Sequence, residues 1–113
     1  MSIHHLTAAM FYILLSLADR PRHGLGIVGD VEERTGYRVK IGPALLYTSL
    51  RRLEAGSLVE VAAPPADEAT DPRRKYYRIT QRGRRAVREE AELLEAVVML
   101  ARDRKVLPRG SNR

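Results

Sequence analysis

Apolar residues recur at helical spacing in four segments of the chain, and they alternate with polar residues in two shorter segments. Residues 6–18 are apolar almost all round, which is typical of a helix buried on more than one side. Narrower stripes at helical intervals follow in residues 24–35, 43–55 and 81–105. The strand-like alternation lies in residues 58–62 and 74–79, which would form a hairpin. The pattern predicts a mainly α domain with a small β-hairpin, of the α+β class.

Proline and threonine set the expected boundaries of these segments. Pro21 cannot continue the first helix, and Pro43 is suited to the first position of the third helix. Residues 64–72 hold three prolines and no large apolar residue, which predicts a loop between the two strands. Thr80 is the expected N-cap of the last helix.

The phase of each stripe predicts which side chains enter the core. We expect Leu25 on the inner face of the second helix. In the second strand, Tyr77 should face the core and Tyr76 should face away from it. A helix turns by ~100° per residue, so residues 43–55 also have a face opposite their leucines. The side chains on that face are small near the start of the helix and basic further along. Such a face can approach a nucleic-acid groove closely.

The charge of the chain is concentrated in two blocks. Lys and Arg number 20 against 14 Asp and Glu, for a net charge of +6, and most of the cations are arginine. Residues 34–53 hold five basic residues and no acid, and residues 72–88 hold eight basic residues and no acid. Residues 54–71, between these blocks, hold five acids and no base. This distribution favours an electropositive face for an anionic partner, and arginine suits bidentate phosphate and guanine contacts.

Three helices, a hairpin and a further helix follow the order of a winged helix-turn-helix fold. In such a fold an exposed helix enters a major groove ~12 Å wide, and the hairpin makes a second contact. We therefore expect residues 1–80 to form a winged-helix DNA-binding domain, whose first helix also contributes to a dimer. Residues 81–107 should form a dimerisation helix, and residues 108–113 a flexible tail.

The expected DNA contacts fall into three groups. Base edges are assigned to Thr48 and Arg51, although Arg51 as a phosphate contact is at least as good an interpretation. The Tyr47 hydroxyl either contacts a phosphate or belongs to a ring that packs on the hairpin. Pro43 and Ala44 lie at the small start of the same face. Phosphate contacts are assigned to Lys40, Arg52, Arg73, Arg74 and Lys75.

The apolar pattern of the last helix predicts that it packs against a second copy of the chain. A heptad seam, with apolar residues at alternating intervals of four and three, runs through Val87, Ala91, Leu94, Val98 and Ala101. Leu6 and Met10 of the first helix are expected to join it in a homodimer interface. The alternative is a helix that packs only within its own subunit.

Several classes of function find no support in the sequence. The chain has no cysteine, no phosphate-binding loop and no Ser-His-acid set, so we expect neither an enzyme nor a cofactor. His23 is interpreted as a structural residue at the start of the second helix, His4 and His5 receive no role, and no metal is expected. No apolar run reaches the ~20 residues that span a bilayer, and the first residues lack a signal-peptide pattern. We therefore expect a cytoplasmic protein with no membrane partner.

An ordered set of motifs resembles the PadR family of bacterial transcriptional regulators, in its compact branch with a short C-terminal helix. The motifs are His23 with Gly24, Leu46 with Tyr47, residues 50–54, and residues 73–80 with Gly83. The resemblance implies a homodimeric winged-helix protein that usually represses nearby genes. It also implies that the first and last helices form the dimer interface. Three departures are Leu25 in place of an aromatic residue, Ser57 in place of glycine, and a less hydroxylated turn at residues 43–45.

Three hypotheses follow. The first is a repressor that reads a two-fold-related operator on double-stranded DNA. The second adds a small apolar or aromatic effector at the dimer interface, with Phe11, Val97 and Leu100 as lining residues beside Leu6 and Met10. The third is a winged-helix protein-interaction module without DNA binding.

Overall fold

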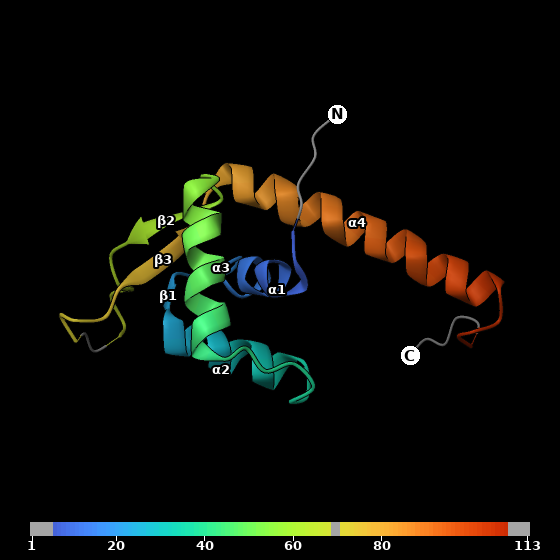
Figure 1. The fold of residues 1–113 in the computed structure, drawn as a ribbon, viewed down its shortest axis with the longest axis horizontal. Coiled ribbons are helices and arrows are strands. Elements are labelled where there is room, and N and C mark those ends of the chain that lie inside the picture. The colour runs from blue at the N-terminus through green and yellow to red at the C-terminus, as the bar shows by residue number, and fades with distance from the viewer. Residues whose placement is uncertain (1–5, 69–70, 109–113) are drawn as a thin grey trace.

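A computed structural model describes residues 6–68 and 71–108 of the chain. The adjacent histidines His4 and His5, and nearly all of the expected tail at residues 108–113, lie outside the described residues. Within these ranges the chain forms four helices and three strands (Figure 1). They are α1 Ala8–Ser16, β1 Arg22–His23, α2 Gly24–Arg34, α3 Pro43–Ala55, β2 Val59–Ala62, β3 Tyr76–Ile79 and α4 Gln81–Asp103. The predicted fold class, including the long C-terminal helix, is confirmed.

Side chains cap three of the helices where the sequence provides a suitable acceptor. The Thr7 hydroxyl accepts from the Met10 amide, and the Thr80 hydroxyl accepts from the Gly83 amide. His23 caps α2 through its ring, and Pro43 opens α3 at a position where no amide hydrogen is needed. The predicted cap at Thr80 and the predicted start of α3 are therefore confirmed.

The sheet has one strand more than the sequence predicted. Its order is β1-β3-β2, and both pairs are antiparallel. The hairpin of β2 and β3 pairs Val59 with Ile79 and Ala62 with Tyr76. The additional strand β1 is only two residues long, too short to show alternation, and it ties the start of α2 to the hairpin. We call residues 59–79, which comprise β2, β3 and their connection, the wing.

The core lies between α1, α2, α3 and the sheet. Ile13 and Leu14 of α1 are fully buried, as are Ile27 of α2 and the three leucines of the α3 stripe. As predicted, α1 is buried on more than one side, because α2, α3 and α4 all contact it. Arg84 of α4 donates a hydrogen bond of 3.1 Å to the Ala18 carbonyl oxygen just after α1.

Two core assignments were wrong. Leu25 is 69% exposed, because the buried residues of α2 are Gly24, Ile27 and Val31, and these share a helix face that excludes Leu25. Tyr76 is only 2% exposed, although alternation placed it on the outer face of its strand. The ring of His23 on β1 lies edge-on to the Tyr76 ring, with centroids 5.2 Å apart. Both faces of β3 are covered at this point, so both tyrosines are buried.

Ser57, two residues before the wing, has an unusual backbone conformation. Ser57 has a φ of 62°, in the left-handed region that favours glycine. The family resemblance expects glycine at this position. The Ser57 carbonyl oxygen accepts a hydrogen bond of 2.6 Å from the Thr80 hydroxyl, which joins the entry to the wing with the start of α4.

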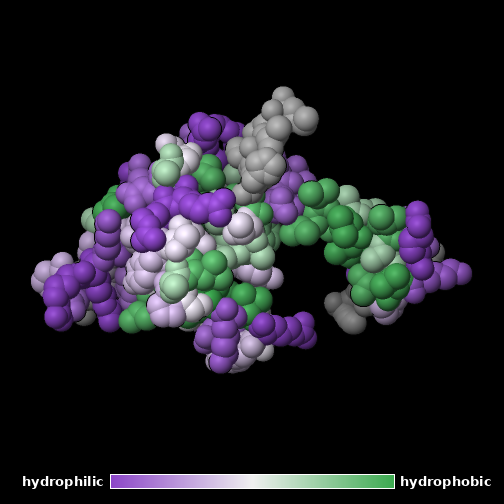
Figure 2. All heavy atoms as spheres, viewed as in Figure 1, coloured by the Kyte–Doolittle hydropathy of each residue, from purple (hydrophilic) through white to green (hydrophobic). Residues whose placement is uncertain are grey.

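Most of α4 projects away from the rest of the described chain (Figure 1). Its buried residues, Gly83, Ala86 and Val87, all lie near its start, and residues 91–100 are exposed. Figure 2 shows apolar side chains gathered along the projecting part of the helix. The large apolar residues exposed there are Leu93, Leu94, Val97, Val98, Met99 and Leu100. In the described residues, no helix combines the length and apolar character needed to cross a membrane.

The structure divides the expected dimer residues into two groups. Met10 and Val87 are buried in the core of their own subunit, and Leu6 is partly buried against it. Met10 and Val87 therefore have little surface left for a partner, whereas Leu6 keeps part of its surface. Ala91, Leu94 and Val98 are exposed, and Ala101 is half-buried. The exposed part of the heptad seam therefore lies on the projecting part of α4.

The close packing of α4 against the wing can be tested by substitution at Gly83. A Cβ there would fall on the Leu58 carbonyl oxygen and lie 2.8 Å from Ile79 Cγ1, so the helix would have to move. We expect Gly83→Ala to lower the free energy of unfolding in urea by about 2–3 kcal/mol. The control is Gly29→Ala in α2, where a Cβ meets nothing within 4 Å. That change should stabilise the protein by about 0.5–1 kcal/mol. Equal effects at the two sites would contradict the close packing.

Candidate nucleic-acid interface

The packing of α3 decides which of its side chains are available to a partner. Leu46, Leu50 and Leu53 are buried, so the opposite face is exposed. The predicted contact residues Pro43, Ala44, Tyr47, Thr48, Arg51 and Arg52 are all exposed. Arg51 and Arg52 supply the positive charge of this face, as the sequence predicted.

A groove of about 480 Å³ lies between α3 and the wing. Five of the predicted contact residues line it, namely Tyr47, Arg51, Arg73, Arg74 and Lys75. His23, Gly24, Leu25, Glu54 and Tyr77 complete the lining. We call it the wing groove. The structure thus brings together the two basic blocks that are separated in the sequence.

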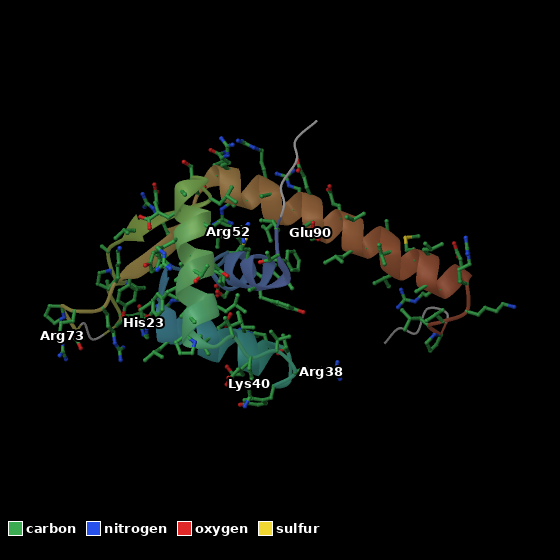
Figure 3. The ribbon with its side chains drawn as sticks, in the orientation of Figure 1. His23, Arg38, Lys40, Arg52, Arg73 and Glu90 are labelled. Atoms are coloured by element: carbon green, nitrogen blue, oxygen red, sulfur yellow. The ribbon has the colours of Figure 1, made fainter. Side chains whose placement is uncertain are left out.

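The remaining predicted contacts are exposed, but they are not part of the lining of this groove. They are Lys40, Pro43, Ala44, Thr48 and Arg52. In Figure 3, Arg38 and Lys40 lie at the connection between α2 and α3, whereas Arg73 lies on the wing. A partner that reaches all of them must extend from the wing across α3 to this connection.

The wing loop is attached to the helical part of the protein by a short polar chain. Arg20, which follows α1, donates hydrogen bonds of 2.8 Å to Asp67 and 3.2 Å to Glu68. Glu68 Oε1 in turn accepts a hydrogen bond of 2.7 Å from the Tyr76 hydroxyl. This hydrogen bond to a carboxylate is the main reason that the pKa of Tyr76 is raised above its ordinary value. The chain fixes the base of the loop beside β3.

Three of the wing cations have partners within the wing. Arg73 pairs with Asp71 at 3.1 Å, and its hydrogen bonds lower the pKa of that carboxyl group. Arg78 pairs with Glu60 on the neighbouring strand at 2.7 Å. The ammonium group of Lys75 lies 5.8 Å from the centre of the Tyr77 ring. An incoming phosphate must therefore compete with Asp71 for Arg73.

His23 has a more specific position than the sequence indicated. Its Nδ1 accepts a hydrogen bond of 3.2 Å from the Gly26 amide, which confirms its structural role at the start of α2. Its Nε2 lies 3.0 Å from a guanidinium nitrogen of Arg74. Burial lowers the pKa of His23, the charge of Arg74 lowers it further, and Glu68 acts in the opposite direction. Sequence reasoning missed this residue as part of the groove, although its family motif could have drawn attention to it.

Tyr47 lies at the junction of α2 and α3. Tyr47 is 45% exposed, and a Cβ at Gly24 would come within 2.7 Å of its hydroxyl oxygen. Glycine at this position therefore lets α2 approach α3. Glu54 and Tyr47 add to burial in raising the pKa of Tyr77 on the wing, so all three groups lie near one another. Both interpretations of Tyr47, phosphate contact and packing against its neighbours, remain compatible with this position.

Acidic and histidine side chains are not arranged for metal binding in the described residues. No three of them are grouped so that they could hold an ion there. The chemistry of the wing groove is that of hydrogen-bond donors and fixed positive charges around one carboxylate, Glu54.

Sequence comparison gives a family match for the residues that build this interface. Residues 13–89 match the family described as the transcriptional regulator PadR-like family. Transcriptional regulator Rv3488 of Mycobacterium tuberculosis is 36% identical over 88 residues, which are 78% of this chain and 77% of that protein. A 37.1 kDa protein in transposon TN4556 of Streptomyces fradiae is 37% identical over 83 residues. That alignment covers 74% of this chain but only 22% of the transposon protein.

Solved structures share the arrangement of helices and wing. A PadR family transcription regulator from Clostridium difficile has a TM-score of 0.73 at 20% identity, covering 86% of this chain and 97% of that one. Bacillus subtilis PadR, solved in complex with operator DNA, has a TM-score of 0.62 at 16% identity, covering 75% and 47%. At 20% and 16% identity, these similarities show a shared fold and nothing about function.

A third structure is that of Bordetella bronchiseptica BpsR, whose DNA binding is regulated by 6-hydroxynicotinic acid. Its TM-score is 0.64 at 26% identity, and the match covers 88% of this chain and 67% of that one.

The attachment of the wing loop can be tested at Tyr76. We expect Tyr76→Phe to lower the melting temperature by about 4 °C or more, because a buried ring loses a hydrogen bond to a carboxylate. The measurement is thermal unfolding followed by circular dichroism at fixed protein concentration. Tyr37→Phe is the matched control, since Tyr37 is exposed, and it should leave the melting temperature unchanged. Equal melting temperatures for both variants would rule out a stabilising role for the bond.

Proposed function

Because this chain belongs to the PadR-like family of transcriptional regulators, we propose that it binds operator DNA as a homodimer and represses the genes it controls. The observation that carries the proposal is the wing groove, where Arg51 of α3 meets Arg73, Arg74 and Lys75 of the wing. Four cations from two separate segments converge there on one side of an exposed helix. A phosphate backbone beside a major groove presents the complementary charge and shape.

The exposed residues fall into two proposed groups, one that contacts bases and one that contacts phosphates. We assign base reading to Thr48 and Arg51, with Pro43 and Ala44 allowing close approach at the start of α3. Phosphate contacts are assigned to Lys40, Arg52, Arg73, Arg74 and Lys75, and Tyr47 is assigned a phosphate contact through its hydroxyl. Phosphate contacts position the protein, and base contacts give it a preferred sequence.

The homodimer is supported by the exposed apolar stripe of α4. We assign the contact to Ala91, Leu94, Val98 and Ala101, with the partly buried Leu6, which precedes α1, at its edge. Burial of such a stripe removes apolar surface from water and so favours association. Two copies related by a two-fold axis present two α3 helices, which fit half-sites one DNA turn, ~34 Å, or a multiple of it apart. In this arrangement residues 1–80 bind DNA and residues 81–107 hold the dimer.

An effector site at the dimer interface is a further part of the proposal. BpsR, which is 26% identical, is regulated by a small aromatic acid. Phe11 lies on α1 against the core, and Val97 and Leu100 are exposed on the projecting part of α4. The start of α4 contacts α1 of the same subunit, but the projecting part that carries Val97 and Leu100 would need a second copy to place it against Phe11 (Figure 1). An apolar effector would therefore bind only to the dimer. A thermal shift with aromatic acids tests this, and a flat response would count against it.

The proposal places the protein in the cytoplasm, where its DNA is, and gives it no enzymatic activity. The competing hypothesis is a winged-helix protein-interaction module without DNA binding. A stable dimer with no salt-sensitive affinity for DNA would favour that hypothesis over the proposed function.

Substitutions at two arginines can distinguish a base contact from a phosphate contact. We expect Arg51→Ala to weaken binding to DNA from upstream of the protein's own gene by about fivefold or more, and to reduce the preference over an unrelated duplex. Arg74→Ala should weaken binding to both duplexes alike and reduce the salt slope by about 1. Fluorescence anisotropy with labelled duplexes measures both effects. Arg34→Ala is the control, because Arg34 lies at the end of α2 outside the wing groove.

The outcomes distinguish the roles of these residues. Equal loss on both duplexes for Arg51→Ala would make it a phosphate contact. Unchanged affinity for Arg74→Ala would remove the wing from the interface. Equal loss for Arg34→Ala would show a general charge effect rather than a local contact.

The dimer can be tested on α4. Val98→Glu places a charge in the proposed seam, and we expect it to raise the dissociation constant of the dimer about tenfold or more and to weaken DNA binding. Met99→Glu is the control, because its side chain points away from the seam and is 61% exposed. Light scattering after size-exclusion chromatography measures the mass of each variant. If both variants remain dimers, α4 does not form the interface.

A further inference from the structure

His23 faces hydrogen-bond donors with both nitrogens of its ring. The Gly26 amide donates to Nδ1, and a guanidinium nitrogen of Arg74 lies 3.0 Å from Nε2. A neutral imidazole has a single lone pair that can accept, because its other nitrogen carries a proton. Arginine has no acceptor and stays protonated. In either tautomer, therefore, one ring nitrogen presents its own N–H to another donor.

The acidic side chains near His23 already have partners. Glu68 accepts from the Tyr76 hydroxyl through Oε1 and from Arg20 through Oε2. Asp71 accepts from Arg73 through both of its oxygens. Among the described residues neither carboxylate forms a hydrogen bond with His23 or with the guanidinium group of Arg74, although the charge of Glu68 acts on His23 and the charges of Asp71 and Arg74 act on each other. In that part of the chain the two facing donors therefore have no anionic acceptor within hydrogen-bond distance.

With Nδ1 occupied by the Gly26 amide, Nε2 carries the proton and becomes a donor beside Arg74. An anionic oxygen placed next to the pair would accept one hydrogen bond from His23 and one from Arg74. The two donors that face each other in the free protein would then both have an acceptor. We propose that His23 and Arg74 together bind one phosphate of the DNA, which makes His23 a direct DNA ligand in addition to the cap of α2. This inference rests on the proposed function, since it concerns the same interface.

A phosphate bound at this pair would change the protonation of His23. The groups around the ring are the Gly26 amide of α2, Tyr76 of β3, and Arg74 and Glu68 of the wing. From α3, the wing groove also receives Tyr47, Arg51 and Glu54. In the free protein, burial and Arg74 lower the pKa of His23. A bound phosphate adds negative charge beside the ring and raises this pKa, so binding takes up a proton.

The sign of the pH dependence follows from this uptake. Below both pKa values the histidine is charged in the free and the bound protein, and above both it is neutral in each. Between them DNA binding is accompanied by protonation, and affinity falls as the pH rises. One proton changes affinity by at most about tenfold per pH unit.

The experiment measures binding at about pH 6 and about pH 8 at constant ionic strength, the range in which histidine titrates. The probe is a labelled duplex of arbitrary sequence at low salt, because a phosphate contact needs no operator. We expect the protein to bind about fivefold more tightly at the lower pH. His23→Asn should lose most of this difference, since asparagine retains a helix cap but does not titrate. The matched control, His4→Asn with His5→Asn, should keep it.

The outcomes separate this inference from the proposed function. If the unaltered protein binds no DNA at either pH, both fail together. If it binds and His23→Asn shows the same pH dependence, the inference alone is overturned. Where His23→Asn does not fold, the pKa of His23 is measured by NMR in the unaltered protein. It should rise when the duplex is added, and an unchanged pKa would overturn the inference.

Discussion

The interface depends on the burial of three leucines of α3 against the rest of the core. Leu46, Leu50 and Leu53 are at most 1% exposed, so the rotation of α3 about its axis is fixed. That rotation places Arg51 and Arg52 on the outside. The wing then takes its position from the same core, because Tyr77 and Ile79 are buried with these leucines. Hydrophobic packing thus decides where the charges lie that we propose as contacts to DNA.

The wing is electrostatically more balanced than its sequence of cations indicates. Asp71 and Glu60 pair with Arg73 and Arg78, while Arg20 reaches the loop from the helical part and engages Asp67 and Glu68. The arginines of the pairs with Asp71 and Glu60 are exposed, and such pairs contribute little to stability, so a phosphate can displace them at small cost. They keep the cations arranged along the wing in the absence of a partner.

Local signals made the helices predictable, and tertiary contacts explain what was missed. Caps and prolines act over one turn, so Thr80 and Pro43 marked their helices correctly. The burial of Tyr76 depends on β1, a strand of two residues that exists only because α2 begins beside the hairpin. For the site, composition and spacing identified the cations of α3 and the wing. The approach of His23 to Arg74 joins residues 51 positions apart, and no sequence pattern encodes it.

The proposed DNA binding depends on the wing groove as a surface for a phosphate backbone. The most direct test is the salt dependence of binding, measured by fluorescence anisotropy on DNA from upstream of the protein's own gene and on an unrelated duplex. Each neutralised phosphate contributes about −0.9 to the slope of log affinity against log salt concentration. We expect a steep slope on both duplexes and tighter binding to the upstream DNA. Absence of binding to either duplex at low salt would contradict the account.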